Sequence, residues 1–371
     1  MSKNVKVILQ PIVNALAEKC TGIATKAELE SYEIHVSKED YSLIEDNKIL
    51  IRGLFQPSFS AKFALYEWDS VFYLVETGMP ELSAKTGSGI GYLGIDNEDN
   101  EVLYFLFLSQ AGLQVNDTAK VGEIYNTVFT EDNKTDRISR DVIELLFPEV
   151  NIYKLDKVKI PLAGSIDEYN LKQLTLKYIC AVFQENPFTP VKISTDAIAL
   201  YEKLSENADH LVPIDNLVQS ILAYRWNFVF LDLYRCIERL YVIGWVLDYT
   251  TTFGSSLGKE EIHTKLLDRS VAHHEDEIIK YLFTLLDAGI LAGLDPIRDK
   301  TEHSVFIYDL RNSIVHYQTS DVKHTDEEWN AISLFLLKAI DKLYTVLASD
   351  IKQLGNKEFK KDKSVVAATT A

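Results

Sequence analysis

Apolar and polar positions alternate along much of the first half of the chain, which is typical of strands with one buried face. The clearest case is a pair of β-rich runs, residues 61–68 and 71–76, which flank the polar dipeptide Asp69-Ser70 and so predict a hairpin. We expect a second hairpin from residues 90–95 and 102–108, and strands at 32–36 and 48–55. With helices expected at 8–24 and 137–147, these runs predict a mixed, mainly antiparallel sheet with flanking helices.

After about residue 165 the spacing of apolar residues changes to the three-to-four-residue repeat of amphipathic helices. Ser165 and Glu168 form a capping-box pattern that opens a helix through Tyr178. Pro187 and Pro190 then interrupt the helical pattern, and we expect a domain boundary there. Further helices are predicted at residues 196–205, 214–248, 274–288, 304–317 and 326–354.

These two patterns predict an α+β protein. Residues 1–190 are expected to form a mixed α/β domain that senses a signal or sets specificity, residues 191–355 an α-helical bundle, and residues 356–371 a flexible tail. The clearest helix is the last one, where Thr325 is expected to cap the first turn with Glu328 at the reciprocal position.

Composition narrows the functional classes. The chain has 371 residues, 47% of them hydrophobic, and a net charge of −17. No apolar run reaches membrane-spanning length and no signal peptide is evident, so we expect a cytoplasmic protein without a membrane partner. Its three scattered cysteines are expected to be reduced. The acidic balance argues against a passive nucleic-acid coat protein, but it allows an enzyme with one short phosphate-binding cleft.

Two apparent ligand motifs are set aside. Residues 89–94 match G-x-G-x-x-G, but they lead into a predicted strand and not into the helix that a dinucleotide site requires. His263, His273 and His274 lie near the acidic residues 275–277, yet nothing in their spacing fixes a ligand geometry. The acidic run is better explained as a solvated first turn of a helix. We therefore expect no cofactor and no metal.

The predicted helix at 304–317 carries polar groups that a plain core helix does not need. Arg311, Asn312 and His316 stand among apolar positions at helical spacing. Asn312 and His316 are four residues apart and share one face, whereas Arg311 lies about 140° round the axis from His316 at about 100° per residue. A guanidinium, an amide and a group that titrates near neutrality are thus placed close together.

The earlier long helix also carries charges, at Asp232, Arg235, Glu238 and Arg239. Their three-residue spacings are typical of an ion-pair ladder on a solvated surface. The alternative is that some of them face inward and orient the arginine or the histidine of the later helix. The sequence leaves both interpretations open.

Arg311, Asn312 and His316 form the pattern R-N-x-x-x-H, and here the chain resembles the HEPN superfamily over residues 200–355. The resemblance implies a helical bundle, metal-independent endoribonuclease activity on RNA, and a homodimer whose two motifs share a cleft. Arg311, His316 and Asn312 match the family's catalytic motif, and Glu238 is a looser match. It also implies a role in antiviral defence or toxin-like growth arrest, with an antitoxin or a trigger as partner. Some relatives carry a modified tyrosine two positions after the histidine, where this chain has Gln318.

The residues suit this chemistry, although another interpretation stays open. A histidine exchanges protons near neutral pH, and a guanidinium grips two phosphate oxygens. Alternatively, Arg311 pairs with an acid such as Asp309 or Glu238, and the bundle is a non-catalytic binding or oligomerisation module. Residues 200–320 hold 11 Lys and Arg against 18 Asp and Glu, a net charge of −7. A nuclease with this charge is expected to act on a restricted RNA or after a trigger.

Overall fold

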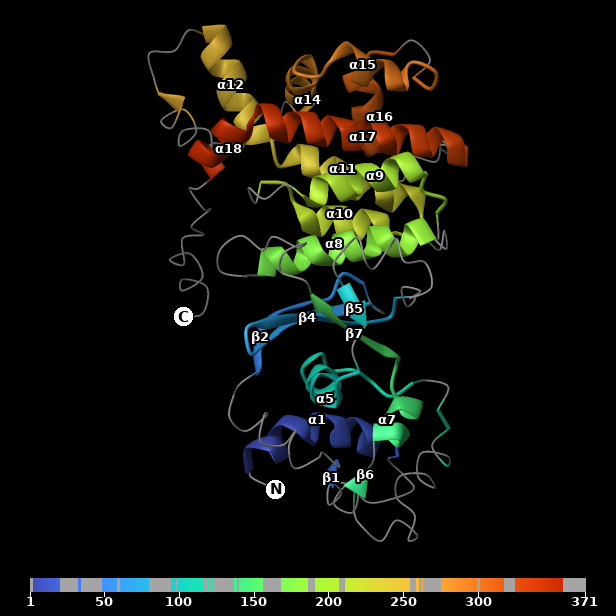
Figure 1. Ribbon diagram of the computed structural model, residues 1–371. Helices are drawn as coiled ribbons and strands as arrows, with labels where there is room; N and C mark the ends of the chain where they lie inside the picture. The colour runs from blue at the N-terminus through green and yellow to red at the C-terminus, as the bar shows by residue number, and fades with distance from the viewer. Residues whose placement is uncertain are drawn as a thin grey trace, which may run out of the picture. The chain divides into compact units, whose positions relative to one another are not determined.

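The structure is a computed structural model that describes residues 3–20, 33–34, 49–58, 61–79, 95–97, 99–116, 119–120, 122, 137–138, 140–155, 168–185, 191–206, 211–253, 258–259, 262, 275–298, 301–316 and 324–355. The chain divides into two compact units, unit 1 (Met1–Asn186) and unit 2 (Pro187–Ala371). Unit 1 combines a sheet with helices, whereas the described part of unit 2 contains helices and no strand (Figure 1). The predicted α+β class is therefore confirmed.

Unit 1 is built on a five-stranded sheet in the order β2-β3-β4-β7-β5, with every neighbouring pair antiparallel. The predicted hairpin at residues 61–76 is confirmed as β3 and β4. Its turn residues Asp69 and Ser70 have φ values of 48° and 63°, as a two-residue hairpin turn requires. The strands are β2 (Ile49–Phe55), β3 (Lys62–Trp68), β4 (Val71–Thr77), β5 (Ile95–Asn97) and β7 (Val150–Leu155).

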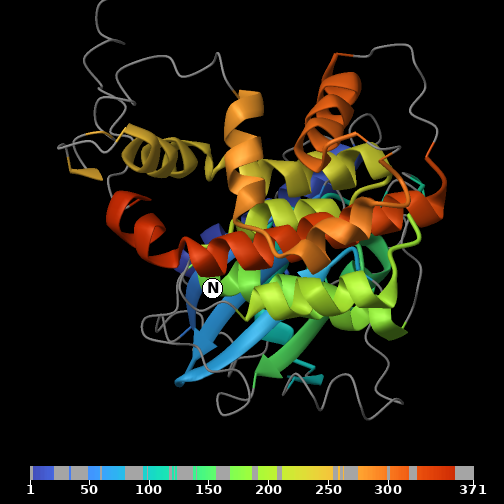
Figure 2. The same ribbon diagram turned by 90° about the horizontal axis from the view of Figure 1, so that it is seen from above.

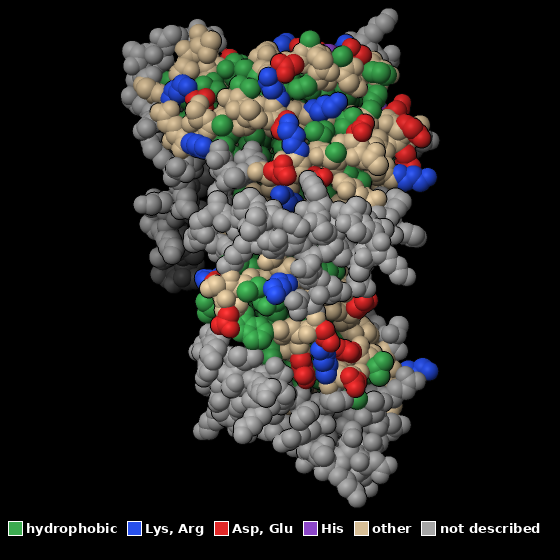
Figure 3. Space-filling model, in the orientation of Figure 1, with side chains coloured by type: hydrophobic (Ala, Val, Ile, Leu, Met, Phe, Trp, Pro, Cys, Tyr) green, Lys and Arg blue, Asp and Glu red, His purple; other side chains and the backbone are tan. Residues whose placement is uncertain are grey.

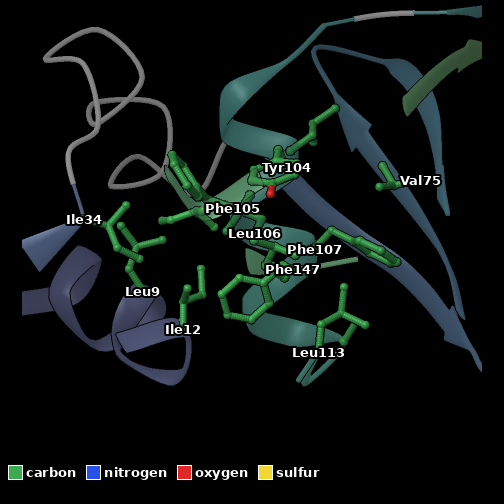
Figure 4. Packing of buried hydrophobic residues seen from close by; sticks show 14 of the residues in the cluster. Leu9, Ile12, Ile34, Val75, Tyr104, Phe105, Leu106, Phe107, Leu113 and Phe147 are labelled. Atoms are coloured by element: carbon green, nitrogen blue, oxygen red, sulfur yellow. The ribbon is translucent and has the colours of Figure 1, made fainter. Parts of the chain in front are cut away.

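The second predicted hairpin is wrong. Residues 102–108, expected to be a strand, belong to helix α5 (Glu101–Gln110), and the side chain of Asn100 caps it by accepting from the Leu103 N–H. Residues 102–108 are all buried, so the run carries no polar face from which a helical period could be recognised. Figure 4 shows these side chains packed with those of α1 (Lys3–Lys19) and of the sheet in one apolar core.

Helix α8 (Glu168–Glu185) also packs on the sheet, where it contacts strands β2 and β3. It continues past the predicted end at Tyr178, and Ser165, its predicted cap, lies outside the described residues. The register of β3, β4 and β7 aligns Phe63, Glu76 and Asn151 in one row. The remaining described elements of unit 1 are α7 (Arg140–Leu146) and the parallel pair β1 (Glu33–Ile34) and β6 (Arg137–Ile138).

Unit 2 is organised around its longest helix, α17 (Asp326–Val346), which α18 (Ala348–Gly355) follows at an angle (Figures 1 and 2). The capping box predicted for Thr325 and Glu328 is present. Helices α9, α10 and α11 lie on one side of α17, and α14, α15 and α16 on the other (Figure 1). The other helices are α9 (Thr195–Ser205), α10 (Ile214–Ile221), α11 (Trp226–Glu238), α12 (Tyr241–Phe253), α14 (Glu275–Thr284), α15 (Ala288–Leu291), the short 3₁₀ turn η2 (Ala292–Leu294) and α16 (His303–Val315).

The long helix expected at residues 214–248 is three helices, α10, α11 and α12. The backbone of Arg225 is extended before α11, with φ −146° and ψ 144°, and a second break separates α11 from α12. Apolar residues in both connections, Ala223 and Leu240, are buried, so the apolar spacing continues through the breaks. Within the described residues, no helix combines the length and the apolar character needed to cross a membrane.

Candidate functional site

Helix α16 carries the arginine and amide of the motif, and buried apolar side chains fix its position. Ile307 and Leu310 are buried, and α16 contacts α14 and α11. Arg311 follows Leu310 directly, so its side chain leaves the helix beside the buried face, with 21% of it exposed. The guanidinium is thus held where the core of unit 2 meets solvent.

This guanidinium lies between two carboxylates that come from two other helices. Its Nη2 atom is 3.3 Å from Oε1 of Glu238 on α11 and 3.8 Å from Oε2 of Glu275 on α14. Its Nη1 atom donates a hydrogen bond of 2.9 Å to Oδ1 of Asn312. The structure therefore brings together three of the four predicted site residues. We call Arg311, Asn312, Glu238 and Glu275 the arginine cluster.

Opposing effects set the charges in the arginine cluster. Burial raises the pKa of Glu238, and the positive charge of Arg311 offsets this only in part. Burial also works against the charge of Arg311, but the carboxylates of Glu238 and Glu275 outweigh it and raise the arginine pKa. With all three groups ionised, two negative charges surround one positive charge. A phosphate must then compete with a carboxylate for the guanidinium.

Two tyrosine hydroxyls lie beside the arginine cluster. The hydroxyls of Tyr234 on α11 and Tyr241 on α12 are 2.5 Å apart. Burial is the main cause that raises the pKa of both phenols, and the charge of Glu238 adds to it. Both tyrosines therefore stay neutral at physiological pH, and because one O–H donates to the other oxygen, one proton of the pair is left to donate to an anion.

His316, the fourth predicted site residue, stands apart from this cluster. It is the C-terminal cap residue of α16, its backbone N–H donates to the carbonyl of Asn312 at 3.0 Å, and it is exposed. Five positions along a helix turn a side chain by about 140°, so His316 and Arg311 leave α16 in different directions. The imidazole is available to solvent, and one chain does not aim both groups at the same point.

The charges of α11 divide between the two interpretations that the sequence left open. Arg235 pairs with Asp232 at 2.6 Å, but only the Arg235 side chain is exposed, at 56%, whereas that of Asp232 is 11% exposed. The pair therefore joins a surface arginine to a largely buried acid and is not a fully solvated ladder. Glu238 instead contacts Arg311, 73 positions later in the chain. Asp309, the other acid considered as a partner of Arg311, is exposed.

The sequence did not identify Glu275, Tyr234 or Tyr241 as part of the site. The sequence predicts Glu275 only as an acid in the first turn of a helix, and it does occupy the first turn of α14. Tyr234 precedes Glu238 by four residues, and Tyr241 follows it by three. A helical projection would have placed Tyr234 on the face of Glu238, whereas no sequence signal connects Glu275 with α16.

Neither of the two motifs set aside contributes to the described structure. The glycines at residues 89–94 and the histidines His263, His273 and His274 lie outside the described residues. Among the residues that are described, no group of three or more His, Cys, Asp or Glu side chains has a geometry that could hold a metal ion.

Unit 1 contains a separate cluster of polar groups in its interior. The Glu76 side chain on β4 is fully buried, and its Oε1 accepts from Asn151 Nδ2 at 2.7 Å and from the Tyr178 hydroxyl at 3.0 Å. The Tyr153 hydroxyl is 3.0 Å from that of Tyr178. Burial raises the pKa of Glu76 to about 8, although the hydrogen bonds oppose this shift. Glu76 is therefore mostly protonated at neutral pH.

No family model, no curated protein and no solved structure matches the chain.

Proposed function

We propose that this protein is a metal-independent endoribonuclease of the HEPN type that acts as a homodimer. Arg311 and His316 from two subunits would line a composite cleft, with Asn312 and Glu238 orienting the arginine. RNA is the substrate, and the biological role is antiviral defence or toxin-like growth arrest. Unit 1 senses the signal or sets specificity, and a trigger or an antitoxin controls activity.

The chemistry needs no metal ion. A histidine removes the proton from the 2′-hydroxyl, and a second histidine protonates the departing 5′-oxygen. A guanidinium stabilises the negative charge that develops on the phosphorus centre. Two copies of the motif supply two histidines and two arginines, and the products carry a 2′,3′-cyclic phosphate and a 5′-hydroxyl.

The observation that carries the proposal is the contact between the side chains of Arg311 and Glu238. The sequence predicts both residues for the site, 73 positions separate them, and Nη2 of Arg311 donates to Oε1 of Glu238 at 3.3 Å. The carboxylate and the amide orient the guanidinium at the edge of the core, where an anion that displaces a carboxylate can bind it. Because Arg311 and His316 leave α16 in different directions, the proposal requires a second subunit that completes the cleft.

The surface charge supports a restricted substrate. On the face of unit 2 drawn in Figure 3, the described Lys and Arg side chains are interspersed with Asp and Glu. Residues 200–320 carry a net charge of −7. RNA therefore gains little attraction from the overall field and depends on local contacts near the site.

The proposal is tested with purified protein and total RNA in the presence of EDTA. Wild-type protein is expected to release fragments with 2′,3′-cyclic phosphate ends, and Arg311→Ala and His316→Ala are expected to abolish the cleavage. His303→Ala, which changes a histidine at the other end of α16, is the matched control and should keep the activity. Cleavage that persists in both motif variants would show that the site is misassigned.

A second candidate function rests on the two carboxylates around Arg311. An arginine with a purely structural role also needs carboxylates that neutralise its charge, as Glu238 and Glu275 do here. If Arg311 has only this role, unit 2 is a non-catalytic binding or oligomerisation module. Growth during overexpression separates the two functions. An active nuclease should be toxic, with toxicity lost in His316→Ala, whereas a binding module should give equal colonies for both proteins.

A further inference from the structure

Helix α11 carries an exposed stripe of aromatic and basic residues that leads to the arginine cluster. Tyr224, just before the helix, is 70% exposed, and Phe228 in its first turn is 54% exposed. Arg235 and Arg239 are exposed farther along. Phe228, Arg235 and Glu238 share one face of the helix, because they are separated by seven and three residues. We call Tyr224, Phe228, Arg235 and Arg239 the α11 stripe.

The α11 stripe carries basic residues although residues 200–320 have a net charge of −7. Arg235 is paired with Asp232 at 2.6 Å. Arg239 has no acidic side chain within ion-pair distance among the described residues, and neither has Arg225, which caps the start of α11. The stripe thus combines exposed rings with positive charge. Rings stack on unpaired bases and arginines contact phosphates, as in proteins that bind single-stranded nucleic acid.

We propose that the α11 stripe is the path along which single-stranded RNA reaches the arginine cluster. This inference rests on the proposed function and adds a substrate class to it. The first base stacks on Phe228 or Tyr224, and the backbone follows Arg235 and Arg239 toward the scissile phosphate. The rise from Phe228 to Glu238 is about 15 Å at about 1.5 Å per residue. That length matches about four stacked nucleotides at about 3.4 Å each.

A duplex and a second protein copy fit the α11 stripe less well. In a duplex the bases are already stacked on each other, so they offer the exposed rings no face. A protein interface of standard size buries about 800 Å² on each partner and is poor in charge at its centre. Here charged residues alternate with only two large rings. Phosphates complement the arginines in charge, and unpaired bases complement the rings.

The test measures binding of the 371-residue chain to a fluorescent single-stranded oligonucleotide by anisotropy in EDTA. All its 2′-hydroxyls are methylated, so the oligonucleotide cannot be cleaved. Stacking of one base contributes about 5- to 150-fold in affinity, and we expect Phe228→Ala to weaken binding at least fivefold. Phe228→Trp should restore binding, and the same sequence as a duplex should bind more weakly. Tyr249→Ala, an exposed tyrosine on α12, is the control and should bind like wild type.

Unchanged binding by Phe228→Ala would overturn the inference. So would sedimentation showing that Phe228→Ala converts a dimer into a monomer, because the stripe would then be a subunit interface. The two proposals fail separately. If binding depends on Phe228 but ordinary RNA is not cleaved, the proposed nuclease activity is refuted and the RNA path along the α11 stripe is retained. If cleavage depends on Arg311 but not on Phe228, the RNA path along the α11 stripe is refuted and the proposed nuclease activity is retained.

Discussion

The buried carboxyl group of Glu76 predicts that unit 1 loses stability as the pH rises through neutrality. The pKa of Glu76 is raised to about 8 in the folded chain, against an ordinary value of 4.5. Between these values the folded state holds a proton that the unfolded state has released. Stability is therefore full below pH 4.5 and falls by about 1.4 kcal/mol per pH unit up to pH 8. The total loss is about 5 kcal/mol, and it stops above pH 8.

Glu76→Gln isolates this effect because an amide cannot ionise. Its oxygen can still accept from Asn151 and Tyr178, while its NH₂ group replaces Oε2, a buried atom without a hydrogen-bond partner in the described structure. Leaving that NH₂ unpaired costs about 1–3 kcal/mol. The variant should thus be less stable than wild type at pH 5 and more stable at pH 8. The difference between the two proteins is expected to change by about 4 kcal/mol over this interval.

Hydrogen exchange measures this difference locally. Tyr178 bonds to Glu76, so protection factors of α8 amides report the free energy of opening at this site. Amides of α17, in the other unit, provide an internal reference. Asp69→Asn removes an exposed carboxyl from the same hairpin and should keep the wild-type pH dependence. An equal pH slope in wild type and Glu76→Gln would refute the assignment of the raised pKa to Glu76.

Two further predictions concern unit 2. Thr325→Ala removes the side-chain half of the capping box of α17 and should lower the free energy of unfolding by about 1 kcal/mol. Urea titration measures this loss, and Thr325→Ser should restore most of it. Glu275→Gln removes one of the two carboxylates near Arg311 and should increase the rate at which phenylglyoxal modifies Arg311. Mass spectrometry measures this rate. Asp276→Asn changes the same net charge on the exposed side of α14, and an equal rate in both variants would contradict a local effect.

Features that depend on neighbours in the sequence were predictable. The turn at Asp69-Ser70 follows from two β-rich runs with two polar residues between them, and both residues adopt the positive φ that this turn requires. The capping box of Thr325 and Glu328 likewise involves residues three positions apart. Helix α5 was missed because its residues are buried on all sides. Its apolar run fits a buried strand as well as a buried helix.

The arginine cluster shows why a motif alone does not define a site. Local rules correctly placed Arg311 and Asn312 on a helix and Glu275 in the first turn of another. The field at a helix N-terminus favours Glu275 whether or not an arginine is near, so the sequence gives no reason to seek a second partner. Packing of α14 and α11 against α16 supplies that partner. It also adds a second negative charge that an incoming phosphate must displace. The sequence therefore identifies the cation, and only the tertiary structure identifies the groups that compete with a ligand for it.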